Sequence, residues 1–496
     1  MGIIRKQTVS GSFYSYAGVL LGFVNLAVLS PMIFTSGQIG VPALLISISI
    51  LVSQLGSLGF NGVTIRLFPY FRERETKHNG FLGLNLLVQS AGLLITLIAT
   101  LLFIPGLIER NQEDMEMLGS YAYLIIPLIV FQVYFVLFES LCRVLYNAAL
   151  GIFLKEFLVR VLDLIIIVLF WFGLISFSGF MYLYIAAYGI PTLVLLIYLV
   201  RKNEFNLKLR LNFISKDLRK DIISVSIYGV IAGFSGIAVI NLDRFMVNEI
   251  LNLSSLGVYT VAFSFGTLIL IPGRAMAKIA APVIADLWKS ESMAEISEVY
   301  KKSSINQFLG GLALLLVLWI SVDDVMLLLP QEYASGKYVI LFIALANLAT
   351  AVSGLSNQVI STSIAYRYST WFMLLLILLV VISNLVFIPL FGITGAALAS
   401  FVSTLIYTAV RIIFLAVRFG MQPFIFSHIT SMVSAIVIYL LVSLLRTEYD
   451  PLINILIRSS FAGLLFIAAS YALKLSPDFN EALKSIISAL RRKDPN

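Results

Sequence analysis

The sequence contains about fourteen uninterrupted apolar runs, each about 20 residues long and separated from the next by a short polar segment. A helix of that length spans roughly 30 Å, which is the thickness of the hydrocarbon core of a membrane. The runs do not alternate between apolar and polar residues, so they favour transmembrane helices over the strands of a barrel. The predicted spans cover residues 12–34, 41–62, 80–104, 119–141, 153–174, 179–200, 222–243, 256–276, 305–328, 336–357, 369–389, 393–416, 427–446 and 452–474.

The composition agrees with an integral membrane protein. Hydrophobic residues make up 60% of the chain, charged residues only 12%, and the mean hydropathy is +0.98. Of the 34 lysines and arginines, about 29 fall on the cytoplasmic side when both termini are placed there, which the positive-inside rule favours. The net charge of +8 is therefore explained by topology and by attraction to anionic lipid, and we expect no nucleic-acid partner.

Redox and metal chemistry lack the residues that they need. Cys142 is the only cysteine, so no internal disulfide can form, and His78 and His428 are the only histidines. No phosphate-binding GxxxxGK[ST] motif occurs, so we expect no ATP-driven step. The first apolar run follows "RKQ" and lacks an A-x-A cleavage pattern, so we expect a retained helix rather than a signal peptide.

An internal repeat indicates how the spans are organised. "GFVNLAVL" from Gly22 matches "GFSGIAVI" from Gly233, "IGVPALLIS" matches "LGVYTVAFS", and "LIYLVR" matches "LIYTAVR", each offset by about 210 residues. Three matches in order at nearly one spacing suggest that spans one to six were duplicated as spans seven to twelve. Because six is even, the two copies enter the membrane in the same sense, as in transporters with a cavity between two halves.

Several stretches carry a resemblance to a known family. The stretches "NLDRFMVNEILNLSSLGVYTVAFSFGTL", "LGSLGFNGVTIRLFP" and "FGITGAALASFVSTLIYTAVR", with the repeat, resemble the polysaccharide exporter branch of the multidrug/oligosaccharidyl-lipid/polysaccharide (MOP) flippase superfamily, which includes the O-antigen flippases. The resemblance implies an all-α, MATE-like membrane fold with two pseudo-symmetric six-helix bundles around a central cavity and two extra C-terminal helices. It further implies alternating access that moves an undecaprenyl-pyrophosphate-linked oligosaccharide across the bacterial inner membrane.

The repeat and the resemblance together divide the chain into four predicted parts. We expect a six-helix bundle with a cytoplasmic linker at 1–220, a second bundle at 221–420, two added spans at 421–475 and a cytoplasmic amphipathic tail at 476–496. The tail begins with Ser476 as its cap, and its pattern is typical of an interfacial helix. The expected partners are the glycolipid, membrane lipids, a polysaccharide polymerase and glycosyltransferases.

A passage for a pyrophosphate needs cations, and few are available within the spans. Arg160 and Asp163 are three residues apart and share a helix face. Arg66 and Arg274 lie near the predicted inner mouth. We predict that these four residues line a cationic, substrate-binding passage. The alternative is structural: a charge pair in span five that includes Glu156, and two arginines that anchor the chain at the inner membrane surface. Arg458, in the last span, is expected to reach the outer headgroups.

Asp243 is the second candidate, because a carboxylate within an apolar run is costly. In sodium-linked lipid II flippases an aspartate at the matching place in span seven helps to hold a cation, and here the resemblance adds Asn384 and Thr404 as polar partners. Ile388 stands where a further carboxylate would strengthen such a site, so Na⁺ and a proton remain equal alternatives for the coupling ion. The structural alternative is an interfacial pair of Asp243 and Arg244 that caps span seven.

Two other functions compete with a flippase. A cation-coupled multidrug exporter of the same fold should have twelve spans and an acidic binding lobe. A membrane-embedded polysaccharide polymerase or transferase should carry a large outward loop or clustered His, Asp or Arg residues. The sequence shows neither set of features, so we do not expect an enzyme, and no cofactor beyond a coupling ion is predicted.

Overall fold

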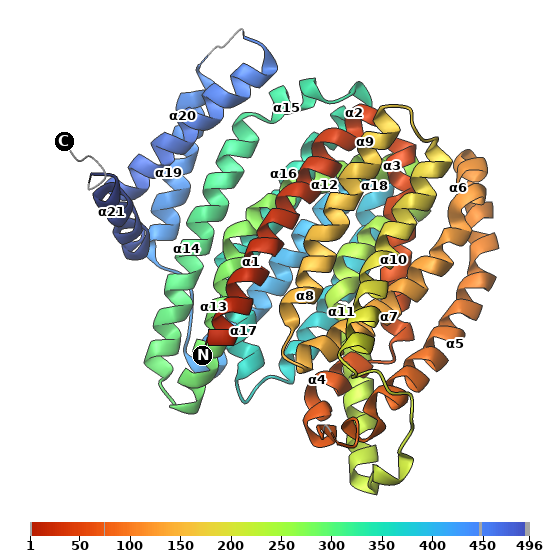
Figure 1. The fold of residues 1–496 in the computed structure, drawn as a ribbon. Coiled ribbons are helices and arrows are strands. Elements are labelled where there is room, and N and C mark those ends of the chain that lie inside the picture. The colour runs from red at the N-terminus through yellow and green to blue at the C-terminus, as the bar shows by residue number, and fades with distance from the viewer. Residues whose placement is uncertain (1, 74, 446–448, 492–496) are drawn as a thin grey trace. The chain divides into compact units, whose positions relative to one another are not determined.

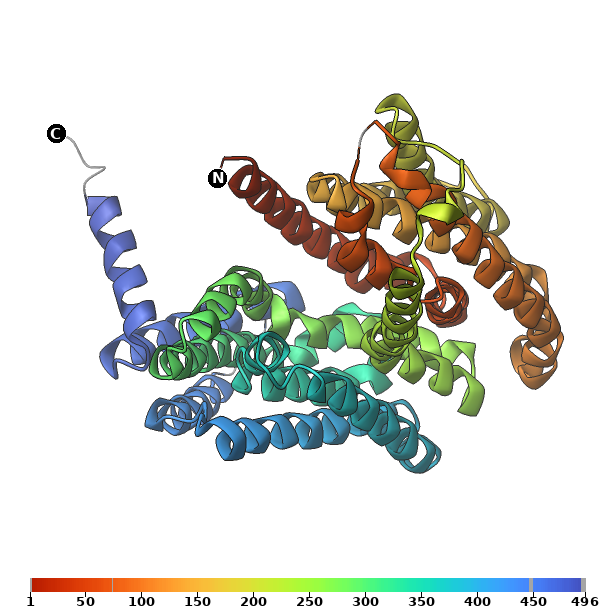
Figure 2. The ribbon, with the colours of Figure 1, turned by 90° about the horizontal axis from the view of Figure 1, so that it is seen from below.

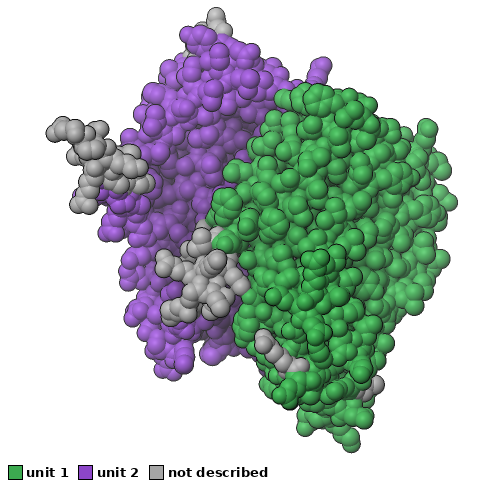
Figure 3. Space-filling view, viewed as in Figure 1, with its two compact units in different colours: residues 1–260 green, residues 261–496 purple. Residues whose placement is uncertain are grey.

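A computed structural model describes residues 2–73, 75–445 and 449–491 of the chain. Within these ranges the chain folds into helices joined by short turns, and no strand is present (Figure 1). The helices form two compact units, residues 1–260 and residues 261–496 (Figure 3). The expectation of an all-α membrane fold is confirmed.

The first unit contains long helices and several short helical segments, of which η1 and η5 are π-helical. Its elements are α1 (Gly2–Phe23), η1 (Val24–Leu29), α2 (Ser30–Ile33), α3 (Ser36–Gly56), α4 (Phe60–Phe71), η2 (His78–Gly80), α5 (Phe81–Arg110), η3 (Gln112–Asp114), α6 (Met115–Tyr121), η4 (Ala122–Leu124), α7 (Ile125–Val144), α8 (Ala148–Ile152), η5 (Phe153–Leu158), α9 (Val159–Trp171), α10 (Phe177–Arg201), η6 (Leu211–Phe213), α11 (Lys216–Ile250) and the start of α12 (Leu253–Gly266).

The second unit begins within α12 and is also helical. Its further elements are η7 (Thr267–Leu270), α13 (Ile271–Lys289), α14 (Met293–Ile320), α15 (Val322–Leu328), η8 (Gln331–Gly336), α16 (Lys337–Val352), α17 (Ser356–Thr362), α18 (Tyr368–Phe419), α19 (Phe426–Ser443), α20 (Pro451–Ala472) and α21 (Pro477–Arg491).

Among the described residues, 11 helical stretches are long and apolar enough to cross a membrane. The count is smaller than the expected fourteen for two reasons. Predicted spans 369–389 and 393–416 both lie within Tyr368–Phe419, which counts once. Predicted spans 153–174 and 222–243 are helical too, in α8–η5–α9 and in α11, but they are outside those 11 stretches.

A glycine separates the two predicted spans within α18. Gly392 has φ 58° and ψ −138°, a combination that side chains with a Cβ rarely adopt. Ser383 lies before this glycine and Ser403 after it, and their Oγ atoms are 2.9 Å apart, so the two arms of α18 pack against each other. Gly395 follows the bend, and a Cβ there would lie 1.9 Å from the carbonyl oxygen of Phe387. The bend therefore needs glycine at both positions.

Replacing Gly395 by alanine should lower the thermal stability of the protein, because the added Cβ would push apart backbone atoms at the bend. The expected cost is about 1–3 kcal/mol, as for other strained backbone positions. Gly106→Ala in α5 is the matched control, since a Cβ there meets nothing within 4 Å. Melting of both variants in detergent checks this, and equal melting temperatures would contradict the strain argument.

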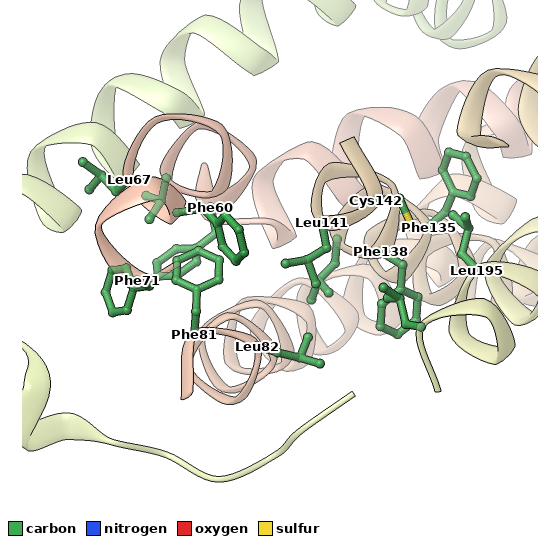
Figure 4. Packing of buried hydrophobic residues seen from close by; sticks show 14 of the residues in the cluster. Phe60, Leu67, Phe71, Phe81, Leu82, Phe135, Phe138, Leu141, Cys142 and Leu195 are labelled. Carbon is green, nitrogen blue, oxygen red and sulfur yellow. The ribbon is translucent and has the colours of Figure 1, made fainter. Parts of the chain in front are cut away.

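The core of the first unit is a cluster of aromatic and aliphatic side chains between α4, α5, α7 and α10. Figure 4 shows Phe71 and Phe81 facing each other, with ring centroids 5.0 Å apart. Cys142 belongs to the same cluster and is fully buried, so it packs as a small apolar side chain. The expectation that this cysteine serves no redox role remains a prediction.

In the second unit, α14, α19 and α20 pack against one another through buried aliphatic side chains (Figures 1 and 2). An ion pair also joins α20 to α15, since Arg458 Nη1 lies 3.1 Å from Asp324 Oδ2. Asn454 Nδ2 donates to the other oxygen of the same carboxylate at 3.3 Å. Arg458 therefore contacts a carboxylate of its own unit, and the expectation that it reaches the outer headgroups stays a prediction.

The tail helix begins as predicted. The amide of Phe479 donates to Ser476 Oγ at 3.3 Å, which caps α21. The side chain of Asn306 on α14 donates to Asp478 Oδ2 at 2.7 Å, so the first turn of the tail is attached to the second unit.

Helix α11 packs against α3 and α4 along its length and is grouped with the first unit. Glycines permit the close approach: a Cβ at Gly59, which has φ +69°, would lie 2.1 Å from the carbonyl oxygen of Ser226. The sequence repeat instead assigns α11 to the second bundle. The predicted division at residue 220 therefore stays a prediction, while the compact unit ends at Thr260.

Polar contacts join the far end of α5 to the turn between α11 and α12. Arg110 Nη1 lies 3.3 Å from Glu249 Oε2, Asn252 Nδ2 donates to Glu113 Oε2 at 3.0 Å, and the Leu253 amide donates to Asp114 Oδ2 at 3.0 Å. We call these three contacts the polar latch, which consists of Arg110, Glu113, Asp114, Glu249, Asn252 and Leu253.

Candidate functional site

The first unit contains a cavity that begins where α1 meets the helix formed by α8, η5 and α9. The two helices touch closely, because a Cβ at Gly18 would lie 1.9 Å from the carbonyl oxygen of Glu156. Next to this contact both helices have a π-helical segment, η1 and η5. Such segments occur often at functional sites, where they re-aim side chains. Asn25 in η1 donates from Nδ2 to the carbonyl oxygen of Arg160 at 2.8 Å. This hydrogen bond joins η1 to the first turn of α9.

The cavity has a volume of about 150 Å³. All of its walls come from the first unit, on α1 to α3, α9 to α12 and η1. It is lined by Gly22, Asn25, Leu26, Ser30, Phe34, Gln38, Ile39, Pro42, Ala43, Ile46, Arg160, Asp163, Ile167, Phe180, Tyr184, Tyr188, Arg244 and Thr260.

Arg160 and Asp163 form the pair that their spacing predicted. Arg160 Nη1 lies 3.4 Å from Asp163 Oδ2 on the next turn of α9. The Asp163 side chain is 4% exposed, whereas that of Arg160 is 40% exposed. Gly22 makes room for the guanidinium, since a Cβ there would lie 3.1 Å from Arg160 Nε. The carboxylate is therefore held by one arginine that keeps part of its own surface open to the cavity.

Arg244 is the cavity residue that the sequence analysis missed. It lines the cavity together with Arg160, so α9 and α11 each contribute one arginine to the lining. Its neighbour Asp243 is 1% exposed, and the hydroxyl of Tyr259 donates to Asp243 Oδ2 at 3.3 Å. Successive residues of a helix point about 100° apart, so the two side chains take different surroundings.

The helix also continues beyond this pair. Helix α11 ends at Ile250, so Asp243 and Arg244 lie within it. The alternative that these two residues cap the end of span seven is therefore wrong. The role of Asp243 as a ligand of a coupling ion stays a prediction.

The other predicted site residues lie elsewhere. Arg66 is exposed on α4 and does not line the cavity. Arg274 lies in α13, but its side chain is outside the described residues. In the second unit Asn384 is fully buried and Thr404 is half-buried. Each directly follows one of the two serines, Ser383 and Ser403, whose hydroxyl groups are in contact. The inner-mouth role of the two arginines stays a prediction. The ion-binding role of the two polar residues stays a prediction as well.

Metal ligands do not gather in the described part of the chain, where no group of three or more His, Cys, Asp or Glu side chains could hold an ion. The cavity instead combines two arginines, one carboxylate, amide groups and tyrosines. Guanidinium groups in a partly desolvated site bind phosphate oxygens through paired hydrogen bonds. The arrangement is suited to binding an anion.

Comparisons with solved structures reveal the fold. The lipid II flippase MurJ, in an inward closed conformation, aligns over 95% of this chain and 98% of its own with a TM-score of 0.73 and 11% identity. An inward-facing multidrug resistance MATE family transporter of the MOP superfamily aligns over 83% and 94% with a TM-score of 0.61 and 14% identity. This chain has the fold of these transporters.

A MATE transporter in the straight conformation also aligns, over 84% of this chain and 96% of its own, with a TM-score of 0.52 and 14% identity. No protein-family model and no curated protein matched the sequence. At these identities the likeness concerns the fold alone, and the MATE-like architecture expected from the sequence is confirmed.

Proposed function

We propose that this chain is a flippase for a lipid-linked glycan. It would move an undecaprenyl-pyrophosphate-linked oligosaccharide, an O-antigen repeat or another surface-polysaccharide unit, from the cytoplasmic to the periplasmic leaflet by alternating access. The bacterial inner membrane is the proposed location, with both termini in the cytoplasm. The fold shared with a lipid II flippase supports this proposal, as do the helices long enough to span a membrane.

The observation that carries the proposal is the pair of arginines at the cavity of the first unit. Placing a cation within a membrane helix costs about 2.5–3.5 kcal/mol on insertion scales, so two cations at one cavity indicate a function. Asp163 is bound to Arg160 and offsets one of the two positive charges. An anion such as a diphosphate would accept hydrogen bonds from these guanidinium groups, while the prenyl tail of the substrate stays in lipid.

The same charge weighs against the second candidate, a cation-coupled multidrug exporter. A drug cation in this cavity would lie beside Arg160 and Arg244, and like charges repel strongly in a site of low polarity. The MATE transporters support the fold but offer no separate support for a drug substrate in this chain.

Photo-crosslinking tests the proposed substrate. A benzoylphenylalanine placed at Ile46, which lines the cavity, should capture a polyprenyl diphosphate that carries sugars, identified by its mass. Benzoylphenylalanine placed instead at Leu102, which is 79% exposed on α5, should capture ordinary membrane lipid. Capture of phospholipid alone at both positions would count against a lipid-linked glycan, and capture of a cationic compound at Ile46 would favour the exporter.

Asp243 offers a test of ion coupling. If its carboxylate binds Na⁺ or a proton, Asp243→Asn should abolish the dependence of transport on the ion gradient, because an amide cannot exchange a proton or neutralise a cation. Asp243→Glu should keep part of that dependence. Transport by both variants at two pH values, with and without Na⁺, checks this. If Asp243→Asn transports like the wild type under every condition, Asp243 binds no coupling ion and has a structural role, such as its contact with Tyr259.

A further inference from the structure

One wall of the cavity is made of stacked aromatic rings that recognition of a diphosphate does not require. Phe180, Tyr184 and Tyr188 are four residues apart on α10, so they share one face of the helix. The ring centroid of Tyr184 lies 5.5 Å from that of Phe180 and 5.4 Å from that of Tyr188. All three line the cavity, and we call them the aromatic strip.

The aromatic strip is apolar on its ring faces and polar along its edge. Phe180 is buried, whereas the two tyrosines are half-buried, and their hydroxyl oxygens lie 3.4 Å apart. A ligand against this wall would therefore meet both ring faces and hydroxyl groups.

Three other residues of the cavity wall contain buried oxygens that lack a hydrogen-bond partner among the described residues. These atoms are Asn25 Oδ1, Asp163 Oδ1 and Thr260 Oγ1. Their side chains belong to residues that are 4%, 2% and 2% exposed. An unsatisfied buried polar group costs about 1–3 kcal/mol, so two acceptors and one hydroxyl at one cavity indicate a missing ligand with hydrogen-bond donors.

A metal cation does not suit this site, because Arg160 and Arg244 line the same cavity and would repel it. An apolar molecule would stack on the rings but leave the three oxygens unsatisfied. A sugar ring meets both demands. Its C–H hydrogens carry a partial positive charge, which the negative face of an aromatic ring attracts. Its hydroxyl groups donate hydrogen bonds.

We infer that the cavity is a saccharide subsite, in which the aromatic strip stacks on a sugar ring and Asp163 and Asn25 accept its hydroxyl protons. This inference rests on the proposed function. The proposed function places the diphosphate at Arg160 and Arg244, and Asp163 lies 3.4 Å from Arg160, so the sugar in the subsite is the one bonded directly to the diphosphate.

Equilibrium binding to the purified full-length chain in nanodiscs tests the inference. The probes are undecaprenyl diphosphate and the same lipid carrying one N-acetylglucosamine, N-acetylgalactosamine or galactose. The wild type should bind at least one sugar-bearing probe about tenfold more tightly than the bare diphosphate, since stacking adds about 0.5–1.5 kcal/mol per ring and the hydroxyls add hydrogen bonds.

The variants locate that preference. The quantity compared is the affinity for the preferred sugar-bearing probe divided by the affinity for the bare diphosphate. This ratio should fall most of the way to one in Tyr184→Leu and in Tyr188→Leu. Tyr188→Phe should keep most of it because the ring remains. Phe172→Leu is the control, since Phe172 is 74% exposed and lies outside the cavity. Size-exclusion chromatography verifies that each variant is folded.

The results separate the inference from the proposed function. If the wild type binds the bare diphosphate but prefers none of the sugar-bearing probes, the subsite inference is overturned and the flippase proposal stands. If the leucine variants keep the wild-type ratio, the aromatic strip is not the sugar contact and the inference is again overturned. If the wild type binds none of the four lipids, the proposed function fails and the subsite falls with it.

Discussion

Replacing both Arg160 and Arg244 by glutamine is expected to reduce the transport of lipid-linked glycan to the level of protein-free vesicles. Each single replacement should lower the initial rate by about tenfold, because a hydrogen bond to a charged group contributes about 1.5–3 kcal/mol and 1.4 kcal/mol corresponds to a factor of ten. Both side chains line the same cavity, so their losses are not expected to be independent. The initial rate of translocation in proteoliposomes measures the effect.

Arg201→Gln is the matched control for these two variants. Arg201 is exposed at the end of α10 and does not line the cavity, yet its replacement removes the same charge from the same unit. Its rate should stay within about twofold of the wild type, since exposed charges contribute little. Equal losses in all three single variants would mean that net charge, and not the cavity, controls transport.

Closing the polar latch with a covalent linker is expected to stop transport completely. The sequence repeat predicts that α11 and α12 belong to the second half of the fold, and the alternating access that we propose would move the two halves apart. The contact between Asn252 and Glu113 joins these helices to the end of α5 and must then break in each cycle. A reducible bis-methanethiosulfonate linker between Glu113→Cys and Asn252→Cys should hold it closed.

The chain is convenient for this experiment because Cys142 is its only cysteine. In a Cys142→Ser background, the linker should abolish transport by the double-cysteine variant, and a reductant should restore it. The Glu113→Cys variant alone, treated with the same linker, is the control. Full transport by the linked protein would show that the latch need not open.

The positions of the spans could be predicted from the sequence because a single property, a long apolar run, determines them. The break at Gly392 falls between the predicted spans 369–389 and 393–416, where Pro389 and Gly392 interrupt the run. The Arg160–Asp163 pair also followed from local geometry, because residues three apart on a helix are neighbours. In each case the deciding interactions lie within one short segment of chain.

Arg244 could not be assigned in the same way. Its neighbour Asp243 has the same depth in the same apolar run, and only the packing of α11 against other helices decides which of the two lines the cavity. The partner of Arg458 was missed for the same reason, since Asp324 is more than a hundred residues away in the sequence. The aromatic strip did carry a signal, namely aromatic residues at a spacing of four on a predicted span.

The central claim is that this chain carries a lipid-linked saccharide across a membrane. The most direct test places undecaprenyl-diphospho-N-acetylglucosamine in the inner leaflet of proteoliposomes and follows its access to a galactosyltransferase added outside. We predict that the rate of access rises with the number of protein molecules per vesicle and falls to the protein-free rate in the Arg160→Gln, Arg244→Gln double variant. A wild-type rate equal to that of protein-free vesicles, in protein that still expels a cationic dye, would contradict the claim.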